Sequence, residues 1–336
     1  MRSVVSYNCI FVIGPTAVGK TAIGVRLACA LNGEILSADS RQVYKGLDIG
    51  SGKDLSDYKV PESLAVKLNP ALKSLCYEGV YELPYHIIDV TDLSFEYSLF
   101  DFVDDFYKAF SDCSNRGVLP ICVGGTGMYI DSILRNYDMI PFTENPDERK
   151  SLEQKSYDEL KQILIEEKEK LHNTSEFGDK ERIIRAILIN RFTKSPEYED
   201  QKNKILSSRQ KINPLVIGTT LDRFLVRKRI AERLKTRLDE GLIEEVESLH
   251  ESGFSWQRLE ALGLEYRFVS EYLQKKIESK EKLFELLNIA IGQFAKRQET
   301  WFRGMGKKGV KINWLPLEND IQVRFAAALK LARDLK

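Results

Sequence analysis

Short apolar runs recur along the chain, and several of them are separated by stretches with a helical pattern. Five runs have the length and composition of buried strands, at residues 9–13, 35–38, 86–90, 119–123 and 215–219. Strands that alternate with helices are typical of a parallel sheet that carries helices on both faces. The pattern therefore predicts an α/β protein, and ligands of such proteins bind beyond the carboxyl ends of the strands.

The alternation stops after Tyr129. Charged segments with a helical pattern follow near 151–171 and 179–191, and a polar stretch at 194–213 precedes the last strand-like run. A helical segment inserted beside a ligand site is often a lid or a substrate clamp. An inserted segment on the surface that has no role in function fits the pattern equally well.

These features divide the chain into two domains. We predict a core formed by residues 1–139 and 213–336, interrupted by a mostly helical insertion at 140–212. Within the core, a single long amphipathic helix is expected after Thr219. Its apolar stripe consists of residues spaced three or four apart, Leu234, Leu238, Leu242, Val246 and Leu249.

One short segment carries a complete phosphate-binding signature, the pattern GxxxxGK[ST]. It lies between the first predicted strand and a helical stretch at 22–31, which is the context that this pattern requires. In such a loop the backbone N–H groups and the helix N-terminus bind an anion, Lys20 adds a positive charge, and the Thr21 hydroxyl is placed to ligate Mg²⁺. The segment predicts a ligand with linked phosphates, bound by Gly14, Pro15, Thr16, Ala17, Val18, Gly19, Lys20 and Thr21.

Polar residues also follow other predicted strands. Asp39 directly follows the second strand, where a carboxylate can act as a general base, ligate Mg²⁺ through water, or simply cap a helix. Thr126 lies in the glycine-rich turn 124–127 and offers a hydroxyl to a ligand, although a tight turn without a ligand explains the same residues. Asp89 comes after His86, Ile87 and Ile88 in the third run, where the Walker B carboxylate of a nucleotide-binding protein is expected.

Composition excludes several classes of protein. The 336 residues are 43% hydrophobic and 30% charged, as in ordinary soluble globular proteins. No apolar run approaches the roughly 20 residues that span a bilayer. Five scattered cysteines without a CxxC pair favour reduced thiols in the cytoplasm, and three histidines make a histidine-based metal site unlikely from the sequence.

Charge is balanced overall but distributed unevenly. Fifty basic residues match fifty acidic ones, so bulk charge gives no support for nucleic-acid binding. Basic residues nevertheless crowd the segments 223–237 and 296–308. Clusters of this kind are usually solvated helix faces.

The motifs together resemble one family, the tRNA dimethylallyltransferases of bacterial type. Besides the phosphate loop, the resemblance is carried by five blocks of sequence that extend over nearly the whole chain, at 37–44, 86–89, 123–129, 182–186 and 294–303. It implies a phosphate-loop parallel sheet with an inserted helical domain that contacts tRNA. It also implies a cytoplasmic enzyme that transfers a dimethylallyl group to N6 of the adenosine following the anticodon, at position 37.

The resemblance implies a role for each catalytic residue. The loop would bind the diphosphate of dimethylallyl diphosphate, with Lys20 and a Thr21-bound Mg²⁺ neutralising the leaving group. Thr126 would donate a hydrogen bond to the oxygen next to the departing carbon, and either Arg223 or Arg229 would add a second cation. Asp39 would accept the proton of the attacking amine, and is a further Mg²⁺ ligand if it acts through water.

The resemblance also implies contacts with the anticodon stem-loop. Because a stacked base must be extruded for this chemistry, the enzyme has to hold the strand around it. The expected contacts come from Asp39, Ser40, Arg41, Gln42, Arg182, Arg185, Lys296, Arg297, Gln298 and Arg303. Trp301 and Phe302, which are adjacent on one helix, are expected to lie in the core, and a monomer is the default expectation.

Two other enzymes share part of this sequence pattern. A prenyltransferase that acts on free adenine nucleotides would need the catalytic motifs but not the basic segment 294–303 or the arginines of the insertion. A kinase that binds ATP would explain the phosphate loop and leave the other motifs unexplained. A non-catalytic nucleotide switch has even less support, because no further segment resembles a switch.

Overall fold

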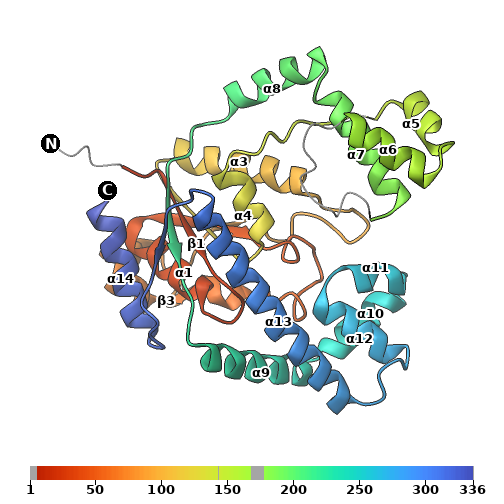
Figure 1. Cartoon of the computed structure of the whole chain (residues 1–336). Coiled ribbons are helices and arrows are strands. Elements are labelled where there is room, and N and C mark those ends of the chain that lie inside the picture. Colours follow the sequence, from red (N-terminus) through yellow and green to blue (C-terminus); the bar gives the residue numbers. More distant parts are fainter. Residues whose placement is uncertain (1–5, 143, 168–177, 336) are drawn as a thin grey trace. The chain divides into compact units, whose positions relative to one another are not determined.

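The computed structural model of the chain describes residues 6–142, 144–167 and 178–335 (Figure 1). The chain forms two compact units, one made of Met1–Asn136 and Lys211–Lys336 and the other of Tyr137–Gln210. The second unit corresponds to the insertion expected at 140–212. Among the described residues, none of the helices has the length and apolarity needed to cross a membrane.

A parallel sheet of six strands forms the centre of the first unit, in the order β5-β2-β6-β1-β7-β8. The strands are β1 (Cys9–Ile13), β2 (Gly33–Ala38), β5 (Tyr85–His86), β6 (Leu119–Gly124), β7 (Pro214–Gly218) and β8 (Ile312–Trp314). The α/β prediction is confirmed. The strand order brings β1 between β6 and β7, so segments far apart in the sequence end at the same edge of the sheet.

Helices cover both faces of this sheet. Alternate residues of each strand point to opposite faces. On one face, Ile10 and Val12 pack with residues of α1 (Lys20–Leu31), α2 (Glu62–Leu68) and α14 (Ile321–Asp334). On the other face, Phe11 meets Phe106 of α3 (Leu99–Asn115), with ring centroids 5.8 Å apart.

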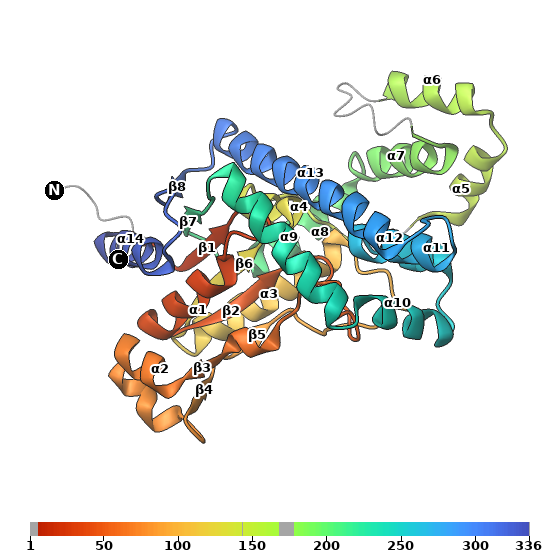
Figure 2. The same ribbon diagram turned by 90° about the horizontal axis from the view of Figure 1, so that it is seen from below.

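The remaining elements of this unit lie beside the sheet or beyond it, with α10, α11 and α12 grouped together away from the strands (Figure 2). Short connections between β2 and β5 include a small antiparallel pair of β3 and β4. All the remaining elements of the first unit, in chain order, are η1 (Leu55–Tyr58), β3 (Lys59–Pro61), η2 (Pro70–Leu75), β4 (Val80–Glu82), α4 (Gly127–Leu134), α9 (Arg223–Asp239), α10 (Leu242–Glu251), α11 (Trp256–Ala261), α12 (Leu264–Leu273) and α13 (Lys280–Lys307).

The second unit contains four described helices and a small core of its own. The helices are α5 (Pro146–Glu153), α6 (Tyr157–Glu167), α7 (Lys180–Phe192) and α8 (Pro196–Ser208). Leu160 and Leu164 of α6 pack against Ile183 and Ile187 of α7, which gives this unit its own apolar contacts.

Two details of the sequence prediction were wrong. The expected strand at 86–90 ends at His86, because Ile87 and Asp89 adopt positive φ values of 63° and 54°, which a strand does not allow. The single helix expected after Thr219 is two helices, which are separated at Gly241. Within the stretch at 194–213, for which the sequence analysis gave no separate helix, α8 begins after a Ser195 cap.

Candidate active site

The phosphate loop connects β1 to α1 and lines a cavity of about 660 Å³. Gly19 caps α1 in the left-handed conformation, with a φ of 81°. Lys20 is the first residue of α1, so its side chain starts where unsatisfied backbone N–H groups and the positive end of the helix dipole lie. Thr16, Ala17 and Thr21 line the same cavity. The loop is therefore placed to receive an anion.

Two partly buried cations face this cavity. Lys20 donates a hydrogen bond from Nζ to the Pro15 carbonyl oxygen at 2.7 Å, and burial lowers the pKa of its ammonium to about 8, partly offset by the nearby Asp39 carboxylate. Arg233 of α9 donates a hydrogen bond to the Thr16 hydroxyl, and burial together with the charge of Arg237 lowers the pKa of its guanidinium to about 10. A lowered pKa means that positive charge at this place lacks sufficient compensation. A bound anion would supply it.

Gln298 of α13 joins the phosphate loop to the glycine-rich turn after β6. Its Oε1 accepts the Thr16 N–H at 2.9 Å, and its Nε2 donates to the Gly125 carbonyl oxygen at 2.8 Å. A Cβ on Gly125 would lie 2.6 Å from Gln298 Nε2 and 3.4 Å from Lys20 Nζ, so this close approach requires glycine. Gln298 is 9% exposed and both ends of its amide are occupied by backbone groups. The position expected to contact tRNA thus holds two loops of the cavity together.

The register of β2 against β6 places Asp39 and Thr126 close together. Ala38 pairs with Gly124 at the carboxyl ends of these strands, so the residues that follow share one edge of the sheet. Asp39 lines the cavity, and its Oδ1 accepts the Arg41 N–H at 3.0 Å. The Thr126 hydroxyl accepts the Ser40 N–H at 3.1 Å, one residue from Asp39. Thr126 itself is not among the residues that line the cavity.

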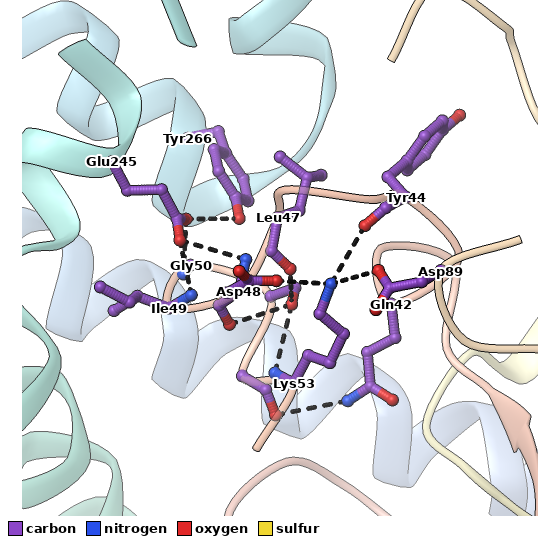
Figure 3. Close-up of polar contacts among 12 residues, drawn as sticks. Gln42, Tyr44, Leu47, Asp48, Ile49, Gly50, Lys53, Asp89, Glu245 and Tyr266 are labelled. Atoms are coloured by element: carbon purple, nitrogen blue, oxygen red, sulfur yellow. Dashed lines mark hydrogen bonds and ion pairs between the residues drawn. The ribbon is translucent and has the colours of Figure 1, made fainter. Parts of the chain in front are cut away.

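The loop at 44–53 lines the cavity with its residues 48–53 and is held by a network of polar contacts (Figure 3). Glu245 of α10 accepts hydrogen bonds from the backbone N–H groups of Asp48, Ile49 and Gly50 at 3.1, 2.7 and 3.0 Å. The Tyr266 hydroxyl donates to the same carboxylate at 2.9 Å. The Glu245–Tyr266 pair therefore fixes this loop from outside.

Lys53 fixes the same loop from inside (Figure 3). Its buried ammonium forms ion pairs with Asp48, at 2.5 Å, and with Asp89, and it also donates to the Tyr44 carbonyl oxygen at 3.3 Å. Asp89, where the sequence suggests a Walker B carboxylate, is thus the partner of Lys53. It is not among the residues that line the cavity.

Arg324 of α14 supports the phosphate loop from behind. The side chain is 1% exposed, and its Nη1 donates to the Val18 carbonyl oxygen at 2.6 Å and to the Thr219 hydroxyl at 3.1 Å. Burial and the charge of Arg229 lower the pKa of this guanidinium. Arg324 therefore adds a further buried positive charge directly behind Gly19, where a Cβ would lie 3.6 Å from Nη2.

The two arginines expected at the diphosphate do not line this cavity. Arg229 donates to the side chain of Asn319 at 2.7 Å, and Arg223 lines a separate hollow that is formed by residues of α9 and α13. The arginines that do line the cavity include Arg233 and Arg237, which lie further along the same helix. Arg237 is 3.7 Å from the carboxylate of Glu265, which leaves Arg233 as the less compensated of the two.

The residues expected to contact tRNA lie in several places. Arg41 and Gln42 line the cavity with Asp39, and Ser40 adjoins them. Lys296 and Arg297 line a hollow on another side of α13, whereas Arg303 pairs with Glu299 at 2.6 Å. In the second unit, Arg182 and Arg185 lie exposed on α7. Their contacts with RNA stay predictions.

The prediction for the adjacent aromatic residues was half right. Phe302 is fully buried, but Trp301 is 40% exposed and lines a hollow. Their side chains point about 100° apart on the helix, so only one of the two faces the core.

Three residues of the site could not be recognised from the sequence, Arg233, Arg324 and Glu245. Arg233 belongs to a basic helix, but nothing in the sequence separates it from its neighbours. The other two act on distant segments of the chain, the phosphate loop and the backbone of Ile49. Only the tertiary structure reveals such contacts.

The cavity also contains oxygen atoms suited to Mg²⁺. The Thr21 hydroxyl and the Asp39 carboxylate line it together, and Mg²⁺ typically binds one or two such oxygens alongside phosphates and water. These residues therefore fit the ion that the phosphate-loop motif implies.

The fold and the cavity define a phosphate-loop α/β protein with an anion site and a carboxylate in one pocket. Comparison with known proteins specifies the family. A family model described as IPP transferase matches residues 76–305, and a model described as isopentenyl transferase matches residues 7–60. The chain belongs to the tRNA dimethylallyltransferase family.

Individual relatives resemble nearly the whole chain. A tRNA dimethylallyltransferase 2 of Treponema denticola is 47% identical over 309 residues, which cover 92% of this chain and 96% of the relative. A tRNA dimethylallyltransferase 1 of Syntrophus aciditrophicus is 44% identical over 314 residues, 92% of this chain and 93% of the relative.

A solved structure shows the same architecture. The full-length tRNA isopentenylpyrophosphate transferase from Bacillus halodurans has a TM-score of 0.66 and 28% identity, and the match covers 98% of this chain and 97% of that one. A eukaryotic dimethylallyltransferase acting on tRNA shares the fold, with a TM-score of 0.65 and 21% identity over 92% of this chain and 74% of that one.

Proposed function

We propose that the protein transfers a dimethylallyl group from dimethylallyl diphosphate to N6 of adenosine 37 in tRNA, and releases diphosphate. The single observation that carries this proposal is that Lys20 and Arg233 share one cavity with the carboxylate of Asp39. The two cations can stabilise the negative charge of the leaving diphosphate, and the carboxylate can accept the proton of the amine that displaces it. The family to which the chain belongs supports the same activity.

The leaving group is the first requirement of this reaction. As the C–O bond to the allylic carbon breaks, negative charge develops on the diphosphate, and positive charge placed there beforehand stabilises the transition state. The phosphate loop, Lys20 and Arg233 supply that charge. Mg²⁺ bound at Thr21 and the diphosphate would supply more of it when present.

The nucleophile is the second requirement. An exocyclic amine of adenine is weakly nucleophilic, and the N–C bond forms more readily as its proton passes to a carboxylate. Asp39 is the carboxylate that lines the cavity next to Lys20. Its Oδ1 is held by the Arg41 N–H, which leaves Oδ2 to receive the proton.

The acceptor decides between this proposal and its alternatives. Purified protein is incubated with labelled dimethylallyl diphosphate, Mg²⁺ and unmodified tRNA, and the label is expected at the adenosine that follows the anticodon. Faster labelling of AMP than of tRNA would replace the proposal by a free-nucleotide prenyltransferase. Release of phosphate from ATP at a comparable rate would instead indicate a kinase.

The same assay tests the role of Asp39. Asp39→Ala is expected to lower turnover far more than it weakens binding of pyrophosphate, because the carboxylate acts on the amine. Asp54→Ala, which removes another carboxylate of the cavity wall, is the matched control. An equal loss of turnover and of pyrophosphate binding in Asp39→Ala would assign this residue to Mg²⁺.

The proposal also includes a cellular setting and partners. We propose that the protein acts in the cytoplasm, with Mg²⁺ as the cofactor and the anticodon stem-loop of tRNA as the macromolecular partner. On this proposal the helical unit Tyr137–Gln210 contributes tRNA contacts through Arg182 and Arg185.

A further inference from the structure

Among the residues that the structure describes, one cluster of metal-binding side chains lies beside the amino end of β2. Each of its four residues offers one ligand atom, and these atoms all lie within 4.8 Å of one another. None of the four lines the active-site cavity. We call this group the Glu34 cluster, and its members are Glu34 of β2, His86 of β5, and Asp112 and Cys113 of α3.

The cluster is built on regular elements and lies apart from the site of the proposed reaction. Glu34 is the second residue of β2, which pairs with β5 at His86. Asp112 and Cys113 belong to the last turn of α3, a helix that contacts β2. Glu34 comes five residues before Asp39, and an extended segment of that length spans roughly 16 Å. The cluster is therefore a second polar site, separate from the diphosphate cavity.

The distances within the cluster suit a tetrahedral metal site. Cys113 Sγ lies 3.6 Å from Glu34 Oε2 and 3.7 Å from His86 Nε2. In a zinc site with bonds of about 2.3 Å to sulfur and about 2.0–2.2 Å to nitrogen or oxygen, tetrahedral angles place the sulfur about 3.5–3.7 Å from each other ligand. Glu34 Oε2 and His86 Nε2, which are 2.8 Å apart, would need to separate by roughly 0.6 Å. An ion thus fits after a small movement of side chains.

The chemistry of the four ligands indicates which ion fits. A thiolate, an imidazole and carboxylates are the ligands of Zn²⁺ in proteins, whereas Mg²⁺ and Ca²⁺ prefer oxygen ligands alone. Cys113 is fully buried and Glu34 is 7% exposed, while Asp112 is exposed. An ion can therefore enter past Asp112 and reach the buried thiol. Four protein ligands fill a tetrahedral shell, which is the arrangement of structural rather than catalytic zinc.

A positively charged group already lies between the carboxylates of the cluster. Arg116 Nη2 donates to Glu34 Oε2 at 2.6 Å and to Asp112 Oδ2 at 2.7 Å, and it lies 3.8 Å from Cys113 Sγ. The guanidinium nitrogen thus marks the point at which three of the four ligands converge on a cation. Arg116 follows α3 and is exposed, so its side chain has room to turn outwards.

We propose that the Glu34 cluster is a structural binding site for Zn²⁺, in which Arg116 takes the place of the ion when zinc is absent. On binding, the guanidinium leaves the two carboxylates, the thiol proton passes to solvent, and the thiolate and imidazole complete the shell. The ion connects β2, β5 and the end of α3. Composition alone argued against a site built on histidines, and this site needs only one, with its other ligands contributed by distant segments.

Co²⁺ is a suitable probe, because it replaces Zn²⁺ in tetrahedral sites and absorbs visible light. Full-length protein is freed of metal with a chelator and titrated with Co²⁺. We expect one ion per chain, with a thiolate-to-cobalt charge-transfer band and the intense visible bands of tetrahedral cobalt. Zn²⁺ should abolish both, since it binds such ligands more tightly than Co²⁺ does. Absence of the charge-transfer band in the wild-type protein would overturn the proposal.

Cys113→Ala separates this site from adventitious binding of metal. The variant is expected to lose the charge-transfer band and to bind Zn²⁺ at least tenfold more weakly. Cys76→Ala removes a thiol outside the cluster and should behave as the wild type does. Thermal melting shows whether each variant is folded. The same band in Cys113→Ala as in the wild type would assign the ion to another place.

Arg116→Gln tests the competition between the guanidinium and the ion, and it keeps the test valid if Cys113→Ala does not fold. Removal of the competing charge should raise the affinity for Zn²⁺ several-fold. Arg135→Gln, which removes an arginine that lies 3.3 Å from Asp131, is the matched control and should leave the affinity unchanged. Unchanged or weaker zinc binding in Arg116→Gln would contradict the exchange of guanidinium for metal.

A structural ion should also stabilise the fold. Zn²⁺ at about 100 times its dissociation constant is expected to raise the Tm of the wild-type protein by roughly 4 °C. The Tm of Cys113→Ala should not change at the same concentration. An equal effect of Zn²⁺ on both proteins would contradict a site at the Glu34 cluster. These measurements require no turnover, so their outcome does not depend on the proposed function.

Discussion

Lys20 and Arg233 keep positive charge in a cavity where burial disfavours it. The pKa of Lys20 falls to about 8 and that of Arg233 to about 10, and in both cases burial is the main cause. Such an arrangement is unfavourable for the empty protein. A bound diphosphate would offset this unfavourable free energy, because the charged forms of Lys20 and Arg233 would then have a partner of opposite charge.

This lowered pKa of Lys20 predicts how binding depends on pH. Below pH 8 the ammonium is already charged, whereas above pH 8 each binding event must take up a proton. Pyrophosphate affinity is therefore expected to fall as pH rises above 8, by up to about tenfold per pH unit. Calorimetric titrations between about pH 7 and pH 9.5 measure this dependence.

Lys20→Met is the matched control, since pyrophosphate titrates identically in both experiments. The variant should bind more weakly at pH 7 and lose the part of the pH dependence that Lys20 causes. The same pH profile in both proteins would contradict the interpretation.

Individual site residues differed in how far the sequence revealed them. Lys20, Thr21 and Asp39 could be placed at the cavity because each lies within a few residues of a strand end, and parallel strands end at one edge. Gln298 could be recognised as a site residue but not as the link between two loops. Arg233 could not be singled out, because its position depends on how α9 crosses the loop.

Gly241 explains why one predicted helix is two. It separates α9 from α10 with a φ of 106°, a conformation that residues with a side chain rarely adopt. The leucine stripe continues across it, since Leu238 and Leu242 are both buried. A periodic apolar pattern therefore identified the buried face and missed the break in the backbone.

Substitution of Gly241 is expected to destabilise the fold. Gly241→Ala should lower the free energy of unfolding by about 1–2 kcal/mol, because the conformation disfavours a Cβ even though its nearest neighbours, in Glu244 and Ile49, would lie at ordinary contact distances of 3.7 and 3.9 Å. Gly304→Ala, within the regular α13, should instead raise it by up to about 1 kcal/mol. Urea denaturation of both variants checks this opposite pair, and a stabilised Gly241→Ala would contradict it.

The predicted end of the strand at 86–90 was wrong for a similar reason. The apolar run at 86–90 has the composition of a strand, but its backbone turns after His86 so that the Asp89 N–H can donate to the Gln42 carbonyl oxygen at 3.0 Å. This contact and the ion pair with Lys53 are between segments far apart in the sequence. The composition of residues 86–90 therefore does not predict either contact.

At the scale of the whole molecule, the anion site is assembled from distant parts of the chain. The loop comes from the first 21 residues, Arg233 from α9, Gln298 from α13 and Arg324 from α14. The fold class and the insertion followed from the strand rhythm, and the resemblance to a family followed from the motifs. The way in which the later helices complete the site required the structure.

Arg324 offers a test of this assembly. Arg324→Met removes a buried charge behind Gly19 and the hydrogen bonds to Val18 and Thr219, so pyrophosphate affinity is expected to fall at least tenfold. Arg333→Met, on an exposed position of the same helix, should bind as the wild type does. Both are measured by calorimetry on protein whose folding is checked by thermal melting.

Wild-type affinity in a folded Arg324→Met variant would show that α14 supports the loop by packing alone. In that case Thr219→Val, which removes only the hydroxyl partner of Arg324, should also bind normally.

The link between Arg324 and Val18 has a consequence for synthesis of the protein. A ribosome that has translated the strands, the phosphate loop and α13 has not yet translated α14. The nascent polypeptide then already contains the motif for its substrate but lacks the guanidinium that supports it. Competence to bind a diphosphate should consequently appear only after α14 has been translated and has docked on the sheet.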